Sequence, residues 1–375
     1  MTTAAATRAR VEGLAALCAE AGLDAIVATK DASIAYLTGF HGLQLERLMA
    51  VVVRADATGA LIAPALDRDG VTAAPTDCEP VLYDASSNGL PELVGALRGA
   101  RRVGVEEDHL PHGRALALAA AGAELVPASA TVMRLRVAKD ADEIAAIRRA
   151  CAAVGEVMEE LFAQLRPGMV EHEVNALVEY RLRRRGAAHA HPLVLFGGHA
   201  SQPHGEPSTR VLEVGDVVCA DVSGSFDGYW GDLTRCGTVG EPGEWARRAW
   251  AVVREAYDAA VAAARPGATA RDVDAAQRAI VESAPDVGDC LHGAGHAIGL
   301  EVHEPPFLVP AGGDVLVAGT VLTIEPGIYR SGQGGIRLED DVLVGADGPE
   351  LLSHLPLELR HIPADAGQTD RRTGS

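Results

Sequence analysis

Apolar and polar positions alternate with two different periods along residues 1–135, and this pattern predicts a succession of helices and strands. The apolar positions with helical spacing near the start are Val11, Leu14, Leu17 and Cys18. The apolar runs that predict strands are residues 24–28, 49–54, 60–63 and 103–106. A further helix is expected to begin near Pro111. Such a mixture of elements is typical of an α/β domain, so we expect one over residues 1–135.

A polar stretch at 136–142 precedes a long amphipathic helix and marks a predicted domain boundary. The helix has apolar residues three or four positions apart, which is the spacing of one buried face. These residues are Ile144, Ile147, Cys151, Val154, Met158, Leu161 and Leu165. An Arg-Pro-Gly sequence at 166–168 ends the helix, and a second helix is expected from about Glu171 to Arg185. We predict a second domain over residues 136–365 and a polar tail at 366–375.

The same order of elements recurs about 99 residues later, which indicates an internal duplication. The predicted helices of the second copy cover 245–264 and 270–283, with another Arg-Pro-Gly sequence at 265–267. In each copy the helices precede a strand that opens with Gly-x-Val and closes with an acid, and a second acid follows. The acids are Asp221 and Asp232 in the first copy, and Glu325 and Glu339 in the second. Two halves related by an approximate twofold axis would each present a pair of acids to one shared cleft.

Composition and charge narrow the class of protein. A chain of 375 residues, 48% of them hydrophobic, can fill two ordinary cores. The net charge of −19, from 33 basic and 52 acidic residues, argues against a nucleic-acid binder and against docking on anionic membranes. No apolar run approaches a membrane span or a signal peptide, and the six cysteines lack a CxxC pair. We therefore expect a cytoplasmic protein.

Four carboxylates and one imidazole lie in separate motifs of the second domain, and together they predict a metal centre. They are Asp221, Asp232, His296, Glu325 and Glu339. Asp221 and Asp232 are 11 residues apart across a predicted hairpin, so both can lie on one side of two adjacent strands. Oxygen donors with one nitrogen suit a pair of divalent cations, with Mn²⁺, Co²⁺, Zn²⁺ and Fe²⁺ all compatible. The set predicts a hydrolase with two metal ions.

Two neighbouring features add to this prediction. Residues 292–305 contain three histidines on a glycine-rich segment that fits neither the helical HExxH zinc motif nor a dinucleotide-binding fingerprint. Strand alternation places Arg337 and Glu339 on one face of their strand. The arginine can orient that carboxylate or hold a substrate oxygen, or the two residues can simply form an ion pair.

Four segments resemble the metallopeptidases of the pita-bread fold, in the branch that contains proline dipeptidase, aminopeptidase P and creatinase. They are GYWGDLTR (228–235), HGAGHAIGLEVHEPP (292–306), LTIEPGIY (322–329) and GIRLEDD (335–341), in the family's order. The segment YLTGF (36–40) is similar to the N-terminal domain of the same branch. The resemblance implies an α/β (α+β) chain with an N-terminal creatinase-like domain. A C-terminal pita-bread catalytic domain with a pseudo-twofold duplication would follow it.

The resemblance also implies two divalent metal ions per chain, with Mn²⁺ as the first expectation. Asp232 and Glu339 would bridge the two ions. His296 and Glu325 would complete the coordination of one ion, and Asp221 that of the other.

Four residues are implied to act on the substrate, and they are His204, His303, Glu325 and Arg337. Glu325 is the expected proton acceptor, and the two histidines are expected to stabilise the reaction intermediate as hydrogen-bond donors. Arg337 takes the position of the family's active-site arginine. The implied reaction is hydrolysis of an Xaa-Pro or related bond in a short peptide, by a protein that forms a homodimer.

The sequence leaves substrate specificity open. Many proline dipeptidases hold the carboxylate of the substrate with an arginine between the second catalytic histidine and the glutamate ligand, but residues 304–324 contain no Arg or Lys. Dipeptidase and aminopeptidase specificities are therefore both compatible with the chain. Two other functions are also considered, a creatinase-like hydrolase of a small amidino compound and a non-catalytic binding protein on the same scaffold.

Overall fold

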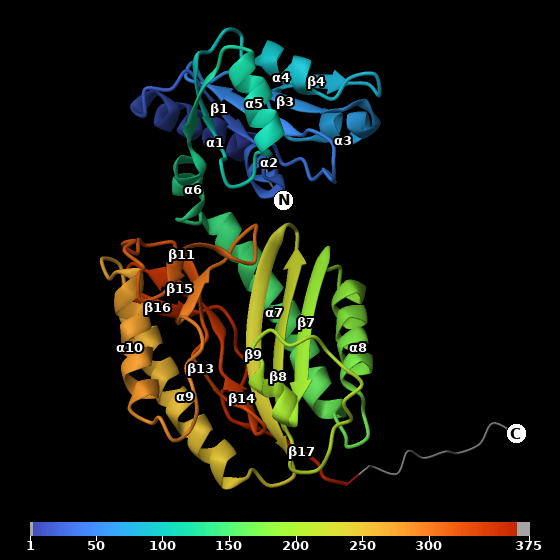
Figure 1. The fold of residues 1–375 in the computed structure, drawn as a ribbon, viewed down its shortest axis with the longest axis vertical. Helices are drawn as coiled ribbons and strands as arrows, with labels where there is room; N and C mark the ends of the chain where they lie inside the picture. The colour runs from blue at the N-terminus through green and yellow to red at the C-terminus, as the bar shows by residue number, and fades with distance from the viewer. Residues whose placement is uncertain (1–2, 366–375) are drawn as a thin grey trace, which may run out of the picture. The chain divides into compact units, whose positions relative to one another are not determined.

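The structure is a computed structural model that describes residues 3–365, so the predicted tail at 366–375 lies outside the described residues. The chain divides into two compact units, of which the first ends at Arg136 and the second begins at Val137 (Figure 1). Within residues 3–365, no helix has the length and apolar character needed to cross a membrane.

The first unit is built on a six-stranded mixed sheet, which confirms the α/β class predicted for it. The strand order is β4-β3-β2-β1-β5-β6, with β1 antiparallel to β2 and parallel to β5. The strands are β1 Ala25–Ala28, β2 Ala50–Arg54, β3 Gly59–Pro64, β4 Glu79–Tyr83, β5 Arg102–Val105 and β6 Glu124–Pro127. The helices are α1 Ala4–Glu20, α2 Asp31–Thr38, α3 Arg68–Ala73, α4 Leu90–Ala96, α5 His112–Ala120 and α6 Ser129–Arg136, with a 3₁₀ turn η1 at Ala65–Asp67. Because β1 lies inside the sheet and is buried along its length, its sequence is continuously apolar.

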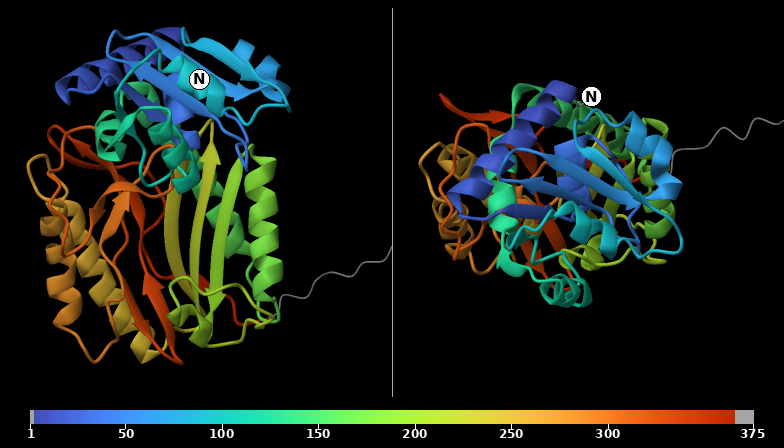
Figure 2. Two further views of the ribbon diagram at one scale, coloured as in Figure 1. Left: turned by 45° about the horizontal axis from the view of Figure 1, so that its top comes forward. Right: turned by 90° about the horizontal axis from the view of Figure 1, so that it is seen from above.

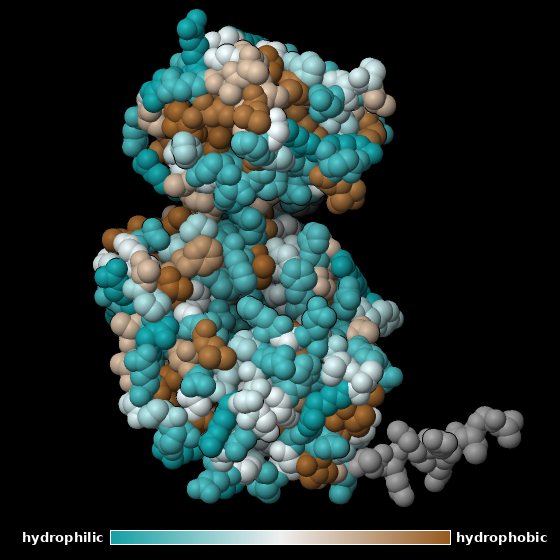
Figure 3. All heavy atoms as spheres, in the orientation of Figure 1, coloured by the Kyte–Doolittle hydropathy of each residue, from teal (hydrophilic) through white to brown (hydrophobic). Residues whose placement is uncertain are grey.

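Apolar side chains also reach the surface of this unit. The large exposed ones are Leu43, Leu45, Leu66 and Leu116. Figure 3 shows apolar groups gathered on the visible face of the first unit and more scattered on that of the second. Single exposed leucines are ordinary on a folded protein.

The second unit consists of sheets that are antiparallel except where β17 pairs in parallel with β9, and two pairs of helices flank them. One sheet has the order β17-β9-β8-β7, another has the order β11-β10-β12-β15-β16, and β13 pairs with β14. The strands are β7 His189–Phe196, β8 Val217–Phe226, β9 Tyr229–Val239, β10 Gly295–Ala297, β11 Glu304–Leu308, β12 Val321–Ile324, β13 Gly327–Arg330, β14 Gly334–Arg337, β15 Asp340–Gly345, β16 Gly348–Leu351 and β17 Arg360–Ile362. The helices are α7 Ala141–Gln164, α8 Glu171–Arg184, α9 Glu244–Ala263 and α10 Ala270–Glu282, with a 3₁₀ turn η2 at Gly197–Ser201. Figures 1 and 2 show the helix pairs outside and the strands between them.

The long helix α7 forms where the sequence predicts it. The side chain of Asp140 caps its N-terminus by accepting a hydrogen bond from the backbone N–H of Glu143, and the side chain of Glu143 accepts one from the backbone N–H of Asp140. The predicted apolar face is buried from Ile147 to Leu165. Its part from Val154 to Leu165 packs on β7, β8 and β9 in one core, while Ile147 and Cys151 belong to a second cluster that contains Trp230 and Val321. The helix ends immediately before the Arg-Pro-Gly sequence.

The predicted internal duplication is visible in equivalent backbone contacts of the two halves. In the first half the N–H of Gly168 donates to the carbonyl of Leu212, and in the second the N–H of Gly267 donates to that of Leu316, both at 2.9 Å. The leucine N–H returns a hydrogen bond to the same turn at 2.8 Å in each half. Each turn joins a helix pair to the segment that enters the acid-bearing strand, β8 or β12. The two halves therefore place their acids by the same local structure.

A buried ion pair ties the two sheets of the second unit together. The guanidinium of Arg235 on β9 lies 2.8 Å from the carboxylate of Asp340 on β15, and both side chains are at most 1% exposed. Asp340 also accepts a hydrogen bond from Tyr257 of α9 at 2.8 Å and another from Ser353. Arg235 donates to the carbonyl of Glu339 at 2.6 Å, so the pair also fixes the backbone beside a predicted metal ligand.

We expect Arg235→Met to destabilise the second unit by about 3–5 kcal/mol, because it leaves the Asp340 carboxylate buried without its cation. Chemical denaturation followed by tryptophan fluorescence measures this effect, since all three tryptophans, at 230, 245 and 250, lie in the second unit. The matched control is Arg254→Met, which removes an exposed pair with Asp258 on α9. The control should lose less than about 1 kcal/mol. Equal losses in the two variants would contradict the importance of the buried pair.

Candidate metal centre

The five predicted metal ligands come from five different segments of the second unit. Asp221 lies within β8, Asp232 within β9 and His296 within β10. Glu325 directly follows β12, and Glu339 lies between β14 and β15. The order of the ligands along the chain thus follows the two duplicated halves.

The hairpin of β8 and β9 places its two acids on one face. Asp232 lies opposite Ser223, and Asp221 lies opposite Thr234. Residues 221 and 223 share one face of β8 because side chains alternate along a strand. The predicted convergence of Asp221 and Asp232 is therefore seen in the register.

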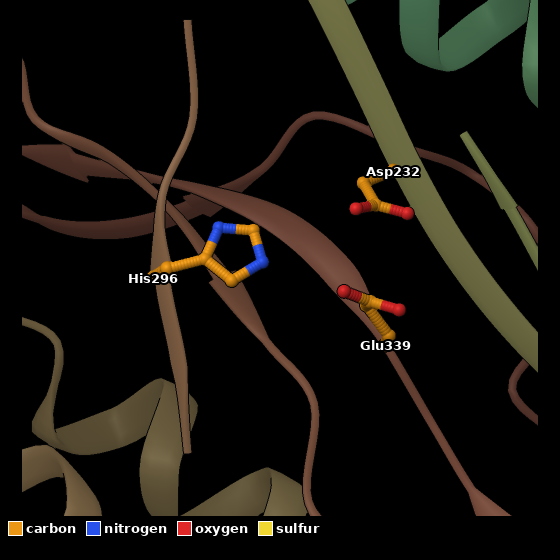
Figure 4. A group of neighbouring side chains, drawn as sticks. All are labelled: Asp232, His296 and Glu339. Atoms are coloured by element: carbon orange, nitrogen blue, oxygen red, sulfur yellow. The ribbon is translucent and has the colours of Figure 1, made fainter. Parts of the chain in front are cut away.

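Asp232, His296 and Glu339 form a compact group. One potential ligand atom from each lies within 4.8 Å of those of the other two, and all three side chains are buried. Figure 4 shows the imidazole of His296 facing the two carboxylates across a gap. Two oxygens and a nitrogen at this separation can hold one metal ion between them.

Glu325 and Asp221 lie at the edge of the same group. Oε1 of Glu325 is 3.6 Å from Nε2 of His296. The negative charges of Asp221 and Glu325 both raise the pKa of Asp232, so both carboxylates lie near it. The structure thus brings all five predicted ligands to one site.

The carboxylates of this site are in an environment that requires positive charge. Burial, followed by the charges of Asp221, Asp341 and Glu325, raises the pKa of Asp232 well above its usual value. Burial and the charge of Asp232 do the same to the pKa of Glu339. Oδ1 of Asp232 is buried and has no hydrogen-bond partner in residues 3–365. Buried acids with an unsatisfied oxygen fit divalent cations, which would neutralise them and accept that oxygen as a ligand.

His296 is prepared to act as a neutral ligand. Burial and the positive charge of His303 lower its pKa to about 3, so the imidazole carries no charge at neutral pH. Its Nδ1 lies 3.1 Å from the carbonyl of Ala297, which can only accept, so Nδ1 holds the proton. The lone pair is then on Nε2, the nitrogen that faces Glu325.

The two predicted catalytic histidines lie beside this site. The rings of His303 and His296 have centroids 4.1 Å apart. The pKa of His303 is lowered by burial and then by the positive charge of His204, which places His204 near it. His204 is exposed, on the loop between η2 and β8. His303 therefore lies against a predicted metal ligand, and the catalytic role of His204 stays a prediction.

Arg337 pairs with Asp221 and not with Glu339, which was one alternative considered from the sequence. One of its terminal nitrogens donates to Oδ2 of Asp221, and the other donates to the hydroxyl of Tyr329 at 2.8 Å. Its Nε donates to Oγ1 of Thr234 at 3.2 Å. That hydroxyl in turn donates to Oε2 of Glu339 at 2.5 Å. Arg337 thus orients two of the predicted ligands, one directly and one through Thr234.

Sequence reasoning did not assign several residues that the structure adds to the site. Nε2 of His292 lies 2.8 Å from the hydroxyl of Tyr329, and its Nδ1 lies 2.8 Å from the carbonyl of Gly293. Because that carbonyl can only accept, Nε2 accepts the proton of Tyr329. Asp341 accepts a hydrogen bond from the backbone N–H of Asp232 at 3.1 Å. Two features of the sequence could have pointed to these residues. His292 begins the HGAGH segment, and Asp341 lies two residues after the predicted ligand Glu339.

Comparisons with known proteins show the family of this chain. The sequence profile of metallopeptidase family M24 matches residues 145–346, and that of the creatinase/prolidase N-terminal domain matches residues 10–138. The site and the fold thus define a metallopeptidase. More particularly, the chain belongs to metallopeptidase family M24, with a creatinase/prolidase N-terminal domain, and divalent metal ions are its cofactors.

Three relatives illustrate the similarity. A probable dipeptidase PepE from Mycobacterium tuberculosis is 36% identical over 355 residues, which cover 93% of this chain and 95% of the relative. The crystal structure of dipeptidase PepE from Mycobacterium ulcerans matches with a TM-score of 0.89 and 33% identity, over 97% of this chain and all of that one. An Xaa-Pro dipeptidase from Bacillus anthracis matches with a TM-score of 0.88 and 31% identity, over 95% of this chain and all of that one. The prediction of a pita-bread metallopeptidase is confirmed.

The metal-free protein should lose stability as the pH rises above about 6.5. Burial raises the pKa of Glu325 from 4.5 to about 7 and that of Asp341 from 3.8 to about 7. The folded state therefore holds more protons than the unfolded state until the pH passes about 7, and this stabilisation is lost as the acids ionise. The lowered pKa values of His292 and His296 act in the opposite direction only below their ordinary value of 6.5.

Thermal denaturation of metal-stripped protein from about pH 6.5 to about pH 8.5 measures this loss. The Tm should fall across this range, and excess Mn²⁺ should remove most of the fall because it neutralises the carboxylates. A Tm of metal-stripped protein that rises with pH would contradict the predicted electrostatics.

Proposed function

We propose that this protein hydrolyses Xaa-Pro or related bonds in short peptides, with two divalent metal ions, Mn²⁺ in the first place. The observation that carries the proposal is the convergence of four carboxylates and a neutral imidazole on one buried site. Relatives named dipeptidase and Xaa-Pro dipeptidase support the choice of substrate. The homodimer and the cytoplasmic location expected from the sequence stay predictions.

The ligands divide between two ions as the resemblance implies. Asp232 and Glu339 would serve both ions, His296 and Glu325 would hold one of them, and Asp221 would hold the other. When bound, the ions supply Lewis-acid activation of water and of the scissile carbonyl. The remaining chemistry belongs to side chains of the protein.

Glu325 is the proposed proton acceptor. Burial raises its pKa to about 7, although the charge of Arg337 opposes this, so the carboxylate can take up and release a proton near neutral pH. In the proposed reaction it removes a proton from the attacking water and passes it to the leaving nitrogen. Its position 3.6 Å from His296 keeps it within the metal centre while it does so.

His303 and His204 are the proposed donors to the oxygen on which negative charge develops. The lowered pKa of His303 makes it a neutral hydrogen-bond donor at neutral pH. A neutral donor stabilises charge that appears during the reaction without repelling the nearby cations. Arg337 holds Asp221 in place through their ion pair, so its proposed role is to orient a ligand.

The arginines near the site bear on substrate specificity. Arg337 is engaged with Asp221, and Arg330 donates to the carbonyl of Asp286 at 3.0 Å. Both arginines already have partners within the protein, so neither is a clear binding group for the carboxylate of a dipeptide. We place dipeptides first because of the relatives' names, and longer Xaa-Pro peptides second. The presence of all five ligand residues argues against the creatinase-like and non-catalytic alternatives.

Release of proline from Ala-Pro by metal-stripped protein, with and without added Mn²⁺, tests the function. We expect release only with metal, because without the ions nothing polarises the scissile carbonyl or lowers the pKa of the attacking water. Release from the longer substrate Ala-Pro-Ala, followed under the same conditions, separates dipeptidase from aminopeptidase activity. Equal release in the presence of a chelator would refute a metal-dependent reaction.

Glu325→Gln should lower kcat by about 100-fold or more, because the amide cannot accept the proton. Binding of a non-hydrolysed product such as proline should be partly retained. Glu350→Gln is a matched control, because Glu350 lies in an exposed pair with Arg148. Near-normal turnover by Glu325→Gln, with its metal content verified, would contradict the assignment.

A further inference from the structure

His204 has no support of its own at the metal centre. Its side chain is exposed, and no hydrogen bond to its imidazole is present within residues 3–365. The loop that carries it follows η2, whose Ala200 carbonyl packs against Gly335 of β14, the strand that ends at Arg337. The position of His204 must therefore be set by the backbone of the loop that carries it.

One buried carboxylate, that of Glu171, contacts several parts of this loop. This residue is the first of α8, and its side chain is fully buried. Oε1 accepts a hydrogen bond from the N–H of Phe196 at 2.8 Å, just before η2. Oε2 accepts from both the N–H and the hydroxyl of Ser208, at 2.9 and 2.6 Å. Nδ1 of His199, within η2, lies 2.8 Å from Oε2. The carboxylate thus holds the start, the middle and the end of the segment that contains His204.

The chemistry of Glu171 suits this task. Its carboxylate lies at the N-terminus of a 14-residue helix, where the helix dipole favours a negative charge. An ionised carboxylate has only acceptor sites, so it can serve several donors at once. Loss of the acceptor would leave the N–H groups of Phe196 and Ser208 without a partner inside the protein.

The other side of the turn is fixed by close backbone packing. A Cβ on Gly335 of β14 would lie 2.2 Å from the carbonyl oxygen of Ala200 in η2. Gly197 adopts a φ of 49°, and a Cβ there would lie 2.2 Å from Oδ1 of Asp216. Close packing therefore restricts the movement of η2, and the contacts of Glu171 restrict it further.

We propose that Glu171 is a positioning residue that holds the 197–208 loop so that His204 faces the substrate. The inference rests on the proposed function, because it acts through the role given there to His204. Within residues 3–365, the carboxylate of Glu171 forms no hydrogen bond or ion pair with the five ligands, and its partners are Phe196, His199 and Ser208. Its effect on catalysis should therefore pass through the loop alone.

The chain offers a matched control one helical turn away, at Asn175. This buried side chain donates to the carbonyl of Val194 at 2.9 Å and accepts from the N–H of Val194 at 2.9 Å. It joins α8 to β7 as Glu171 does, but it does not touch the 197–208 loop. Asn175→Ala therefore measures how disturbing helix α8 affects kcat and Tm while the contacts of Glu171 with the loop of His204 remain.

The experiment is a double-mutant cycle on the full-length, metal-loaded protein, with Ala-Pro as the substrate. Glu171→Gln, His204→Ala and the double variant are compared with the parent by kcat and KM, and Tm and metal content are measured for each. We expect Glu171→Gln to lower kcat by about 10–100-fold when His204 is present, which is usual for residues that support a catalytic group. In the His204→Ala background it should lower kcat by less than about twofold, because the shared partner is already absent.

Two further variants keep the test decisive. Asn175→Ala should lose less than about twofold in kcat, even where its Tm falls as far as that of Glu171→Gln. Ser208→Ala removes one donor of the anchor and should lower kcat in the same direction but less. If Glu171→Gln does not fold, Ser208→Ala in both His204 backgrounds carries the same comparison.

The outcomes separate the inference from the function on which it rests. A Glu171→Gln effect of equal size with and without His204 would overturn the inference alone, since Glu171 would then act independently of that histidine. An equal loss of kcat in Asn175→Ala would also overturn it. Unchanged activity of His204→Ala would instead refute the proposed role of His204, and the inference with it.

Discussion

The concentration of negative charge in one buried cleft is the constraint on which the rest of this structure depends. Asp232 and Glu339 are buried beside Asp221 and Glu325, whose negative charges raise the pKa of both buried acids. Like charges in a poorly hydrated environment are costly unless cations or donors compensate them. Arg337 provides one fixed positive charge, and the chemistry of the site requires the remainder from divalent ions. The fold must therefore hold the carboxylates together against their mutual repulsion, and the buried pair of Arg235 and Asp340 shows how firmly the strands are joined.

The elements with a strong apolar pattern could be predicted from the sequence, and those without it could not. Helix α7 and the central strand β1 were predicted because their apolar residues follow one period over their whole length. Strands β4 and β6 were not, because they are the outer strands of their sheet and are largely exposed or half-buried. An outer strand has fewer buried side chains, so its pattern is weak. The duplication was predictable because both turns carry the same Arg-Pro-Gly sequence.

The ligand set could be proposed in advance because each ligand lies in a recognisable local motif, and the structure brings these residues together. His204 and His303 were proposed only through the resemblance, since an isolated histidine carries little local signal. The partner of Arg337 could not be predicted, because alternation along one strand points to Glu339, while packing between strands places Asp221 within reach. The hydrogen bond of Tyr329 with His292 was missed for the same reason, since it joins residues 37 positions apart.

The anchor of the 197–208 loop exists in only one half of the duplication. Glu171 and Ala270 occupy equivalent first positions in their helices, and the N–H of each donates to the segment that leads into the following acid-bearing strand. A cleft with strict twofold symmetry would offer the same groups to a peptide entering in either orientation. The carboxylate in one half and the methyl group in the other remove this equivalence. A scaffold of two related halves thereby presents unlike groups at two equivalent positions.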